Sequence, residues 1–252
     1  MAAQNIQSVP TAVEPSRASR LPRALVALTI ATALALAVGL YMALVYAGME
    51  STQGNVQRIF YIHMPSFFGA FLAFSATVVG GGMYLRTRQT KWDVLALAGV
   101  EVGLMLSLVN LATGSIWARP IWNTWWTWDP RLTSAAIMGL TYMAYLMLRA
   151  GIENPEQRRR FASVYGILAI STVIMTLIII RIRPDTIHPA PIGGSPQDAQ
   201  GDFNLTPSMV TALLTNLPIW GLLVPITLMW WRIRLENLRE RVDSLKIRLM
   251  EK

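Results

Sequence analysis

The chain of 252 residues contains no cysteine and only two histidines, His63 and His188. Without a thiol it forms no disulfide bond, no thiolate metal site and no cysteine nucleophile, and it gives no sulfur to a thioether. Charge is also scarce, because 14% of the residues are charged whereas 53% are hydrophobic. The charges lie in short blocks between apolar runs of about twenty residues, which is the pattern of a polytopic membrane protein.

Six apolar runs are long enough to form transmembrane helices. They cover about residues 24–47, 65–85, 94–116, 132–148, 161–180 and 208–231. The first run exceeds the roughly 7 to 15 apolar residues of a signal-peptide core, so we expect it to remain as a membrane helix. The prediction is an all-α fold in three parts: a flexible cytoplasmic tail at 1–23, a six-helix membrane domain at 24–231 and a cytoplasmic C-terminal helix at 232–252.

The net charge of +8 would suggest a nucleic-acid partner for a soluble chain, but here the basic residues flank apolar runs. Of the 22 lysines and arginines, three precede the first run, three separate the second from the third, four separate the fourth from the fifth, and seven follow the sixth. These 17 residues share one face of the membrane, which the positive-inside rule assigns to the cytoplasm. We therefore expect both termini inside, and both histidines outside.

A tryptophan-rich loop is predicted at 116–131, on the outer face between the third and fourth runs. It holds five of the nine tryptophans: Trp117, Trp122, Trp125, Trp126 and Trp128. An interfacial belt spreads its tryptophans over several helix ends, whereas these lie in one segment, with Trp122, Trp125 and Trp126 at helical i, i+3, i+4 spacing. The cluster fits a platform for a flat apolar ligand and a surface for a partner protein equally well. At its end, Asp129 and Pro130 predict a helix N-cap and a proline in the first helical position.

The two histidines supply the pair of neutral imidazoles that a six-coordinate haem iron needs on its axes. A zinc site is a weaker hypothesis, since the sequence shows no compact set of histidine, cysteine and carboxylate ligands. Arg58, Arg119 and Arg131 are candidate partners for the two haem propionates. For Arg119, contact with lipid phosphate explains the position equally well.

Glu101 lies well inside the third apolar run. A carboxyl group at that depth of a membrane is energetically costly and is a functional hypothesis by default. A hydrogen bond to Asn110 or to a neighbouring helix would also explain it.

The segment after the sixth run contains a seam of apolar residues at steps of three and four. The seam consists of Leu235, Leu238, Val242, Leu245 and Leu249. It has heptad character over about two heptads. It indicates either a helix that contacts a partner or the membrane surface, or a solvated extension of the sixth span.

The segment WNTWWTWDPRLTS at 122–134 resembles the tryptophan-rich WWD signature of the haem-handling membrane proteins of cytochrome c biogenesis. The resemblance extends to GSIWARPIW at 114–122, Glu-Val-Gly at 101–103, His63 with Arg58 five residues earlier, and His188. Six spans and two histidines are similar to the small CcmC family of this superfamily, whereas its large synthetases have more spans and four relevant histidines. The resemblance covers residues 24–231. It departs at Pro130, where the family usually has a small residue, and this change should stiffen the loop's exit without moving the tryptophans.

The resemblance implies a haem carrier rather than an enzyme, in the inner (cytoplasmic) membrane. It implies that haem b is held at the outer face, with His63 and His188 as axial ligands. The implied platform for haem and its chaperone consists of Trp117, Trp122, Trp125, Trp126, Trp128 and Asp129, supported by Arg58 and Arg131. The implied partners are the haem chaperone CcmE, which receives the haem, the ABC transporter CcmA/CcmB and the small membrane protein CcmD.

Two other classes of protein are alternatives. A membrane b-type cytochrome also uses two histidines, but it usually holds its haem at depth between helices. Here both candidate ligands are predicted at the edge of the membrane, in flexible settings flanked by Pro65 and Pro189, which suits a haem that must leave. A scaffold subunit of a transporter complex that binds no haem would need no axial histidines.

Overall fold

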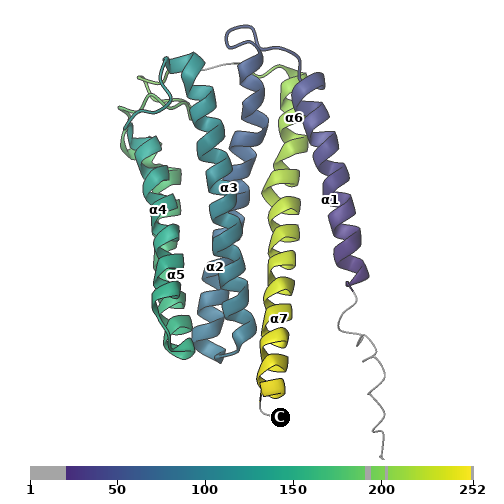
Figure 1. The fold of residues 1–252 in the computed structure, drawn as a ribbon. Coiled ribbons are helices and arrows are strands. Elements are labelled where there is room, and N and C mark those ends of the chain that lie inside the picture. Colours follow the sequence, from purple (N-terminus) through teal and green to yellow (C-terminus); the bar gives the residue numbers. More distant parts are fainter. Residues whose placement is uncertain (1–20, 191–193, 202–203, 251–252) are drawn as a thin grey trace, which may run out of the picture.

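The computed structural model describes residues 21–190, 194–201 and 204–250, and within them the chain is helical apart from its loops and one isolated bridge between Glu50 and Gly54. Six helical rods in this part of the chain run up and down in succession (Figure 1). The first rod is α1 (Arg23–Tyr41) with the π-helical η2 (Met42–Tyr46), and the second is the 3-10 turn η3 (Asn55–Ile59) with α2 (Phe60–Thr87). The next three are α3 (Thr90–Trp122), α4 (Pro130–Gly151) and α5 (Pro155–Ile182). The sixth consists of α6 (Pro207–Pro218), the π-helical η4 (Ile219–Leu223) and α7 (Val224–Met250). The predicted tail at 1–23 lies outside the described residues except for its last three.

Five of the rods are long and apolar enough to cross a membrane: Arg23–Tyr46, Asn55–Thr87, Thr90–Trp122, Pro155–Ile182 and Pro207–Met250. They confirm the prediction of an all-α polytopic membrane protein. The rod α4, predicted as the fourth span, is not among these five; it has 22 residues, with Arg131 in its first turn and Arg149 in its last. It lies beside α5 over its whole length (Figure 1).

Two helix ends differ from the prediction. The helix α2 begins at Phe60, directly after η3, so Pro65 lies inside the helix and not in its first turn. The helix α3 continues through Pro120 to Trp122, where Asn123 ends it with a left-handed φ of 54°. Because Pro120 lies in the last turn, it removes one backbone donor near the helix end and leaves the preceding turns intact. The tryptophan-rich loop therefore spans 123–129 rather than 116–131.

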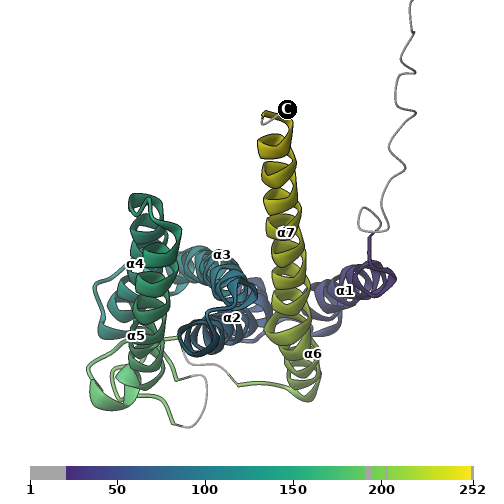
Figure 2. The same cartoon turned by 90° about the horizontal axis from the view of Figure 1, so that it is seen from below.

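The pair α2 and α3 forms the centre of the bundle, with α4 and α5 on one side and α1, α6 and α7 on the other (Figures 1 and 2). Glycines allow this pair to approach closely, since a Cβ on Gly99 would clash with the Ala73 carbonyl and one on Gly103 with the Phe74 ring. The two glycines have the GxxxG spacing common in membrane helix pairs. Phe74 also stacks on Tyr142 of α4, with ring centroids 3.6 Å apart. This packing gives a rigid frame to the side chains at the end of α2 and α3.

The predicted C-terminal helix is continuous with the sixth rod. The helix α7 runs without a break from Val224 to Met250, and its end extends past the ends of α2 to α5 in both views (Figures 1 and 2). Along α7, Arg232 pairs with Glu101 of α3 and, at 2.7 Å, with Glu236. Of the two partners considered for Glu101, the neighbouring helix is therefore the correct one.

Candidate functional site

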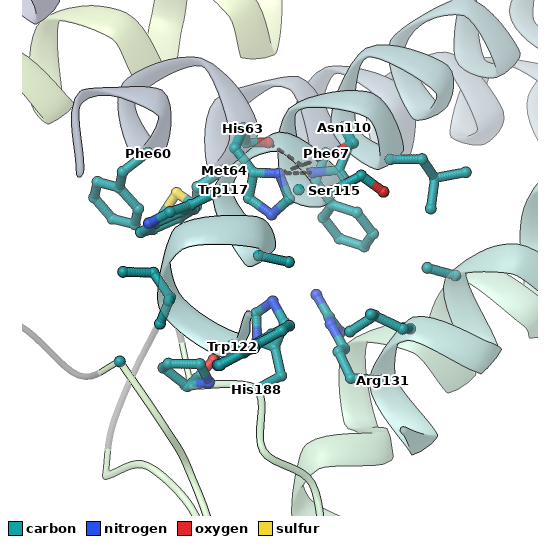
Figure 3. Close-up of a pocket in the computed structure, with 18 of the residues that line it drawn as sticks. Phe60, His63, Met64, Phe67, Asn110, Ser115, Trp117, Trp122, Arg131 and His188 are labelled. Atoms are coloured by element: carbon teal, nitrogen blue, oxygen red, sulfur yellow. Dashed lines mark hydrogen bonds between the residues drawn. The ribbon is translucent and has the colours of Figure 1, made fainter. Parts of the chain in front are cut away.

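A cavity of about 310 Å³ opens at one end of the bundle, where α2, α3, α4, α5 and the loop 183–206 meet (Figure 3). Small-molecule sites have volumes of roughly 300 to 1,000 Å³. The aromatic part of its wall consists of Phe60, Phe67, Phe68, Trp117, Trp122 and Trp126. Among its polar side chains are His63, Asn110, Arg131 and His188. An apolar cavity with a few polar groups is the usual form of a site for a small organic ligand.

His63 projects into the cavity from α2 (Figure 3). Its Nδ1 lies 3.0 Å from the backbone oxygen of Asn110, whose side-chain amide donates to the His63 carbonyl at 2.7 Å. A carbonyl oxygen only accepts hydrogen bonds, so Nδ1 carries the proton and Nε2 keeps a lone pair for a ligand. Gly114 leaves room for the ring, since a Cβ there would lie 2.9 Å from His63 Cε1. The frame of α2 and α3 therefore holds this imidazole in one orientation.

His188 enters the cavity from the loop 183–206, opposite His63 (Figure 3). Its Nδ1 lies 2.7 Å from the carbonyl oxygen of Pro189, which again leaves Nε2 with the free lone pair. Burial, and after it the positive charge of Arg131, lower the pKa of His188 to about 4. The imidazole is therefore neutral at pH 7, as a metal ligand must be.

The two imidazoles face each other across the cavity. Their ring centroids are 6.5 Å apart, and their planes differ by 30°. Two imidazoles that bind one metal ion from opposite sides have centroids about 6.2 Å apart, given a metal–nitrogen bond of about 2.0 Å and about 1.1 Å from nitrogen to ring centre. The observed spacing is close to this value, so the pair suits axial ligation of a single metal ion.

Of the three arginines predicted near the site, Arg131 alone lines the cavity. Its guanidinium carbon lies 5.2 Å from the centre of the Phe67 ring, in the cavity that both histidines enter (Figure 3). Arg58 donates to a carbonyl in the segment before η3 at 3.1 Å, and Arg119 donates to Asn123 at 2.5 and 2.6 Å. These two arginines stabilise the backbone beside the site, whereas Arg131 is placed to meet an anionic group inside it.

The five tryptophans divide between two surfaces. Trp117, Trp122 and Trp126 line the cavity, whereas Trp125 and Trp128 lie outside it and are 58% and 79% exposed. The helical spacing expected for three of them is wrong, because α3 ends at Trp122 and the loop 123–129 is not helical. The cluster therefore offers one aromatic surface to a ligand in the cavity and another to the surroundings.

Hydrogen bonds fix two of the inner rings. The indole Nε1 of Trp117 donates to the side-chain oxygen of Gln53 at 2.8 Å, and that of Trp122 donates to the carbonyl of Gln200 at 3.1 Å. The side-chain amide of Gln53 donates in turn to the carbonyl of Gly201. The inner tryptophans are thus connected to the loop that carries the second histidine.

Asp129 caps α4 and also fastens the loop of His188. Its Oδ1 accepts from two backbone N–H groups in the first turn of α4, at 2.9 and 3.1 Å, which confirms the predicted N-cap. Its Oδ2 accepts from the hydroxyl of the buried Thr186 and, at 2.9 Å, from the backbone N–H of Ile187. The Thr186 hydroxyl oxygen also lies 3.2 Å from the backbone nitrogen of His188. This contact of Asp129 with Thr186 and Ile187, termed the clasp below, connects the start of α4 to the backbone of the second histidine.

The sequence did not identify Gln53, Gly114 or Thr186 as site residues, and it considered Asn110 only as a partner for Glu101. An amide inside an apolar run is a signal for a buried polar contact, so Asn110 was detectable. The other three give no local signal, because their contacts join segments that are far apart in the chain. Glu101 lies outside the cavity.

The fold and the cavity define a class of protein: a polytopic helical membrane protein with two opposed imidazoles in an aromatic cavity at one end. The family model described as Heme exporter protein C matches residues 9–248. The chain therefore belongs to the Heme exporter protein C (CcmC) family, which consists of haem-handling membrane proteins of cytochrome c biogenesis.

Individual members of this family are similar over most of the chain. The Heme exporter protein C of Bradyrhizobium diazoefficiens is 32% identical over 227 residues, which cover 87% of this chain and 81% of that protein. The protein of the same name from Haemophilus influenzae is 29% identical over 209 residues, covering 83% and 82% of the two chains. The one from Escherichia coli K12 is 30% identical over 152 residues, covering 60% and 61%.

Proposed function

We propose that the chain binds haem b in the cavity, with His63 and His188 as the two axial ligands of the iron, and passes the haem on at the outer face of the membrane. The observation that carries this proposal is the 6.5 Å spacing of the two imidazoles. In each of them a backbone carbonyl near Nδ1 leaves Nε2 free for the metal. Two opposed neutral imidazoles are the ligand set of a six-coordinate haem.

The rest of the cavity suits the macrocycle and its propionates. Trp117, Trp122 and Trp126 provide flat apolar surface for a porphyrin and exclude water from it. Arg131 places a cation in this apolar cavity, and a cation there is costly without an anion beside it. A propionate would supply that anion through charge-assisted hydrogen bonds.

The outer tryptophans support a second part of the proposal, which is transfer of the haem. Trp125 and Trp128 are exposed beside the cavity, and exposed tryptophans are typical anchors of protein interfaces. We assign them to contact with a CcmE-like haem chaperone. We assign the CcmA/CcmB transporter and a CcmD-like small protein as further partners of the chain. In this proposal the chain is a haem carrier and not an enzyme.

The orientation of the protein is also part of the proposal. The distribution of lysine and arginine supports six spans including α4, cytoplasmic termini and a cavity on the outer face of the membrane, which we assign as the inner membrane. Because the chain has no cysteine, Ser51→Cys and Ser244→Cys each introduce a unique thiol at an exposed position. In intact cells, a membrane-impermeant thiol reagent should label the first variant and not the second. The reverse pattern would overturn the orientation.

The alternative classes have less support. A b-type cytochrome holds its haem permanently between helices, whereas here one of the two imidazoles is carried by a loop at the end of the bundle. A scaffold subunit would have no use for two neutral, opposed imidazoles beside a cavity-lining arginine.

The absorption spectrum of the purified protein tests the proposal. We expect the haem bands of a six-coordinate complex in the native protein and reduced haem retention in both His63→Ala and His188→Ala. Exogenous imidazole should restore part of the haem by filling the vacated axial position. Gly82→Ala is the control, because this residue lies outside the cavity and nothing lies within 4 Å of the added Cβ. Unchanged haem content and spectrum in both histidine variants would contradict the proposal.

A further inference from the structure

A second surface lies at the end of the molecule far from the cavity, on the last part of α7 (Figure 1). Every residue from Asn237 to Met250 is exposed, and this part of the helix extends past the ends of α2 to α5 (Figures 1 and 2). The seam predicted from the sequence lies along it: Leu235, Leu238, Val242, Leu245 and Leu249 are all exposed. A continuous apolar stripe on a helix outside the bundle marks a surface that a partner covers.

The charges beside the seam have one sign. With Leu235 and Val242 at heptad position a, the e and g positions that flank the seam over the next two turns are all basic: Arg239, Arg241, Lys246 and Arg248. The acidic residues of the same stretch, Glu236, Glu240 and Asp243, occupy positions b and f on the opposite face. Among the described residues of this stretch, one ion pair crosses the division: it joins Lys246 to Asp243 at 3.8 Å and is too exposed to cancel the charge of the flank.

This arrangement disfavours a second copy of the chain as the partner. In a coiled coil the e and g residues of one helix lie against those of the other and decide which helices pair. If two copies of α7 paired, the arginines and lysines of one helix would lie against those of the other, whether the helices were parallel or antiparallel. Such like-charge contacts select against the pair.

A membrane surface is the other class of partner for a basic amphipathic helix, and the geometry of α7 argues against it. A helix that lies on a membrane must bend where its transmembrane part ends. Here α7 is one uninterrupted helix, with no proline or glycine after Pro225. The helix is also held to α3 just before the seam, because Arg232 bonds Glu101. The seam is therefore carried past the ends of α2 to α5 in line with the rest of α7.

We propose that residues 235–250 of α7 dock an acidic amphipathic helix of a partner protein. The apolar residues of that helix cover the seam, and its glutamates or aspartates lie against the four basic residues of the flank. The site is separate from the haem cavity and does not depend on the proposed haem ligands.

The experiment uses the full chain in nanodiscs of zwitterionic phosphatidylcholine, which has no net charge, and two labelled peptides of about three heptads. Both peptides have leucine at a and d; one has glutamate at e and g, and its twin has lysine there. Fluorescence anisotropy should show that the acidic peptide binds about tenfold or more tightly than the basic twin. High salt should reduce this preference, because the charges are exposed.

Three variants separate the parts of the proposal. Joint replacement Arg239→Glu, Arg241→Glu, Lys246→Glu and Arg248→Glu should invert the preference between the peptides. Joint replacement Leu238→Ser, Val242→Ser and Leu245→Ser should abolish binding of both. Glu240→Lys on the opposite face is the matched control and should leave the preference unchanged. All these side chains are exposed, so the bundle itself should fold as before.

Other outcomes would overturn the proposal. Equal binding of the two peptides, or no binding of either, would remove the acidic helix as the partner. A polarity-sensitive dye on Ser244→Cys reports the membrane alternative. Its emission should be the same in nanodiscs with and without anionic phosphatidylglycerol, and a blue shift confined to the anionic nanodiscs would assign the seam to a lipid surface instead.

Discussion

The two halves of the cavity are built in different ways. His63 belongs to a helix packed closely on α3, and its ring is fixed by the backbone of Asn110 and by the space that Gly114 leaves. His188 belongs to the loop 183–206, and its ring bonds the carbonyl of the next residue. The clasp at Asp129 connects that loop to α4. One candidate ligand is therefore part of the frame, and the other is fastened to it.

This difference suggests how a carrier can hold and release the same ligand. A hydrogen bond to a charged group contributes about 1.5 to 3 kcal/mol, so opening the clasp costs a few kcal/mol. Separating α2 from α3 would expose a buried core that includes Phe74, Val100 and Leu106. We infer that haem leaves by movement of the His188 half while His63 stays in place.

The largest effect is expected from crowding the fixed half. Gly114→Ala adds a Cβ that would lie 2.9 Å from the His63 ring, which the packed helices cannot accommodate without displacing it. Overpacking of this kind costs about 1 to 3 kcal/mol, and the upper end corresponds to roughly a hundredfold loss of haem affinity. A haem titration followed by absorbance measures it. Gly82→Ala on the same bundle is the control, because nothing lies within 4 Å of its added Cβ.

The next effect is expected from opening the clasp. In Asp129→Asn, the amide can still cap α4, since asparagine is as good an N-cap as aspartate, but the clasp loses one acceptor oxygen and its charge. We expect haem affinity to fall by about 2 kcal/mol, roughly thirtyfold, with partial recovery in imidazole.

The matched control for the clasp is Asp185→Asn. This exposed aspartate of the same loop pairs with Arg183 at 2.6 Å and does not line the cavity. Its variant should bind haem as the native protein does. Equal losses in the two variants would mean that the loop as a whole, and not the clasp, determines retention.

A smaller effect separates the two tryptophan surfaces. Trp126→Ala removes a cavity wall and should weaken haem binding by about 1.5 kcal/mol, roughly tenfold, with Trp126→Phe milder. Trp125→Ala should leave haem binding intact and slow transfer to the chaperone, because its indole lies outside the cavity. Equilibrium titration and a transfer assay measured on both variants test this division. It fails if the two variants lose the same function.

The smallest effect is expected at Asn110. Asn110→Ala keeps the backbone oxygen that orients His63 but removes the amide that donates to the His63 carbonyl at 2.7 Å. We expect a loss of about 1 kcal/mol, roughly fivefold in haem affinity, without a change of spin state. A change to the spectrum of a five-coordinate haem would show that the side chain of Asn110, rather than its backbone oxygen, holds His63 in position to bind the iron.

Local patterns predicted much of this structure. The apolar runs located the helical rods to within a few residues at most ends, and the Asp129–Pro130 pair marked the start of α4. The two histidines were identified because they are the chain's only imidazoles.

Other features depend on contacts that no local pattern contains. The second oxygen of Asp129 bonds residues 57 and 58 positions away, and the room for His63 comes from a glycine on another helix. The end of α3 was misplaced because the apolar run was ended at residue 116, whereas the helix continues to Trp122 with Pro120 in its last turn.

Electron paramagnetic resonance of the ferric haem complex tests the central claim most directly, because two strong-field nitrogen ligands make ferric haem low-spin. The native protein should give a low-spin signal, and both His63→Ala and His188→Ala should give high-spin iron that returns to low-spin in imidazole. A high-spin native complex, or a low-spin signal that survives both single substitutions, would contradict axial ligation by this pair.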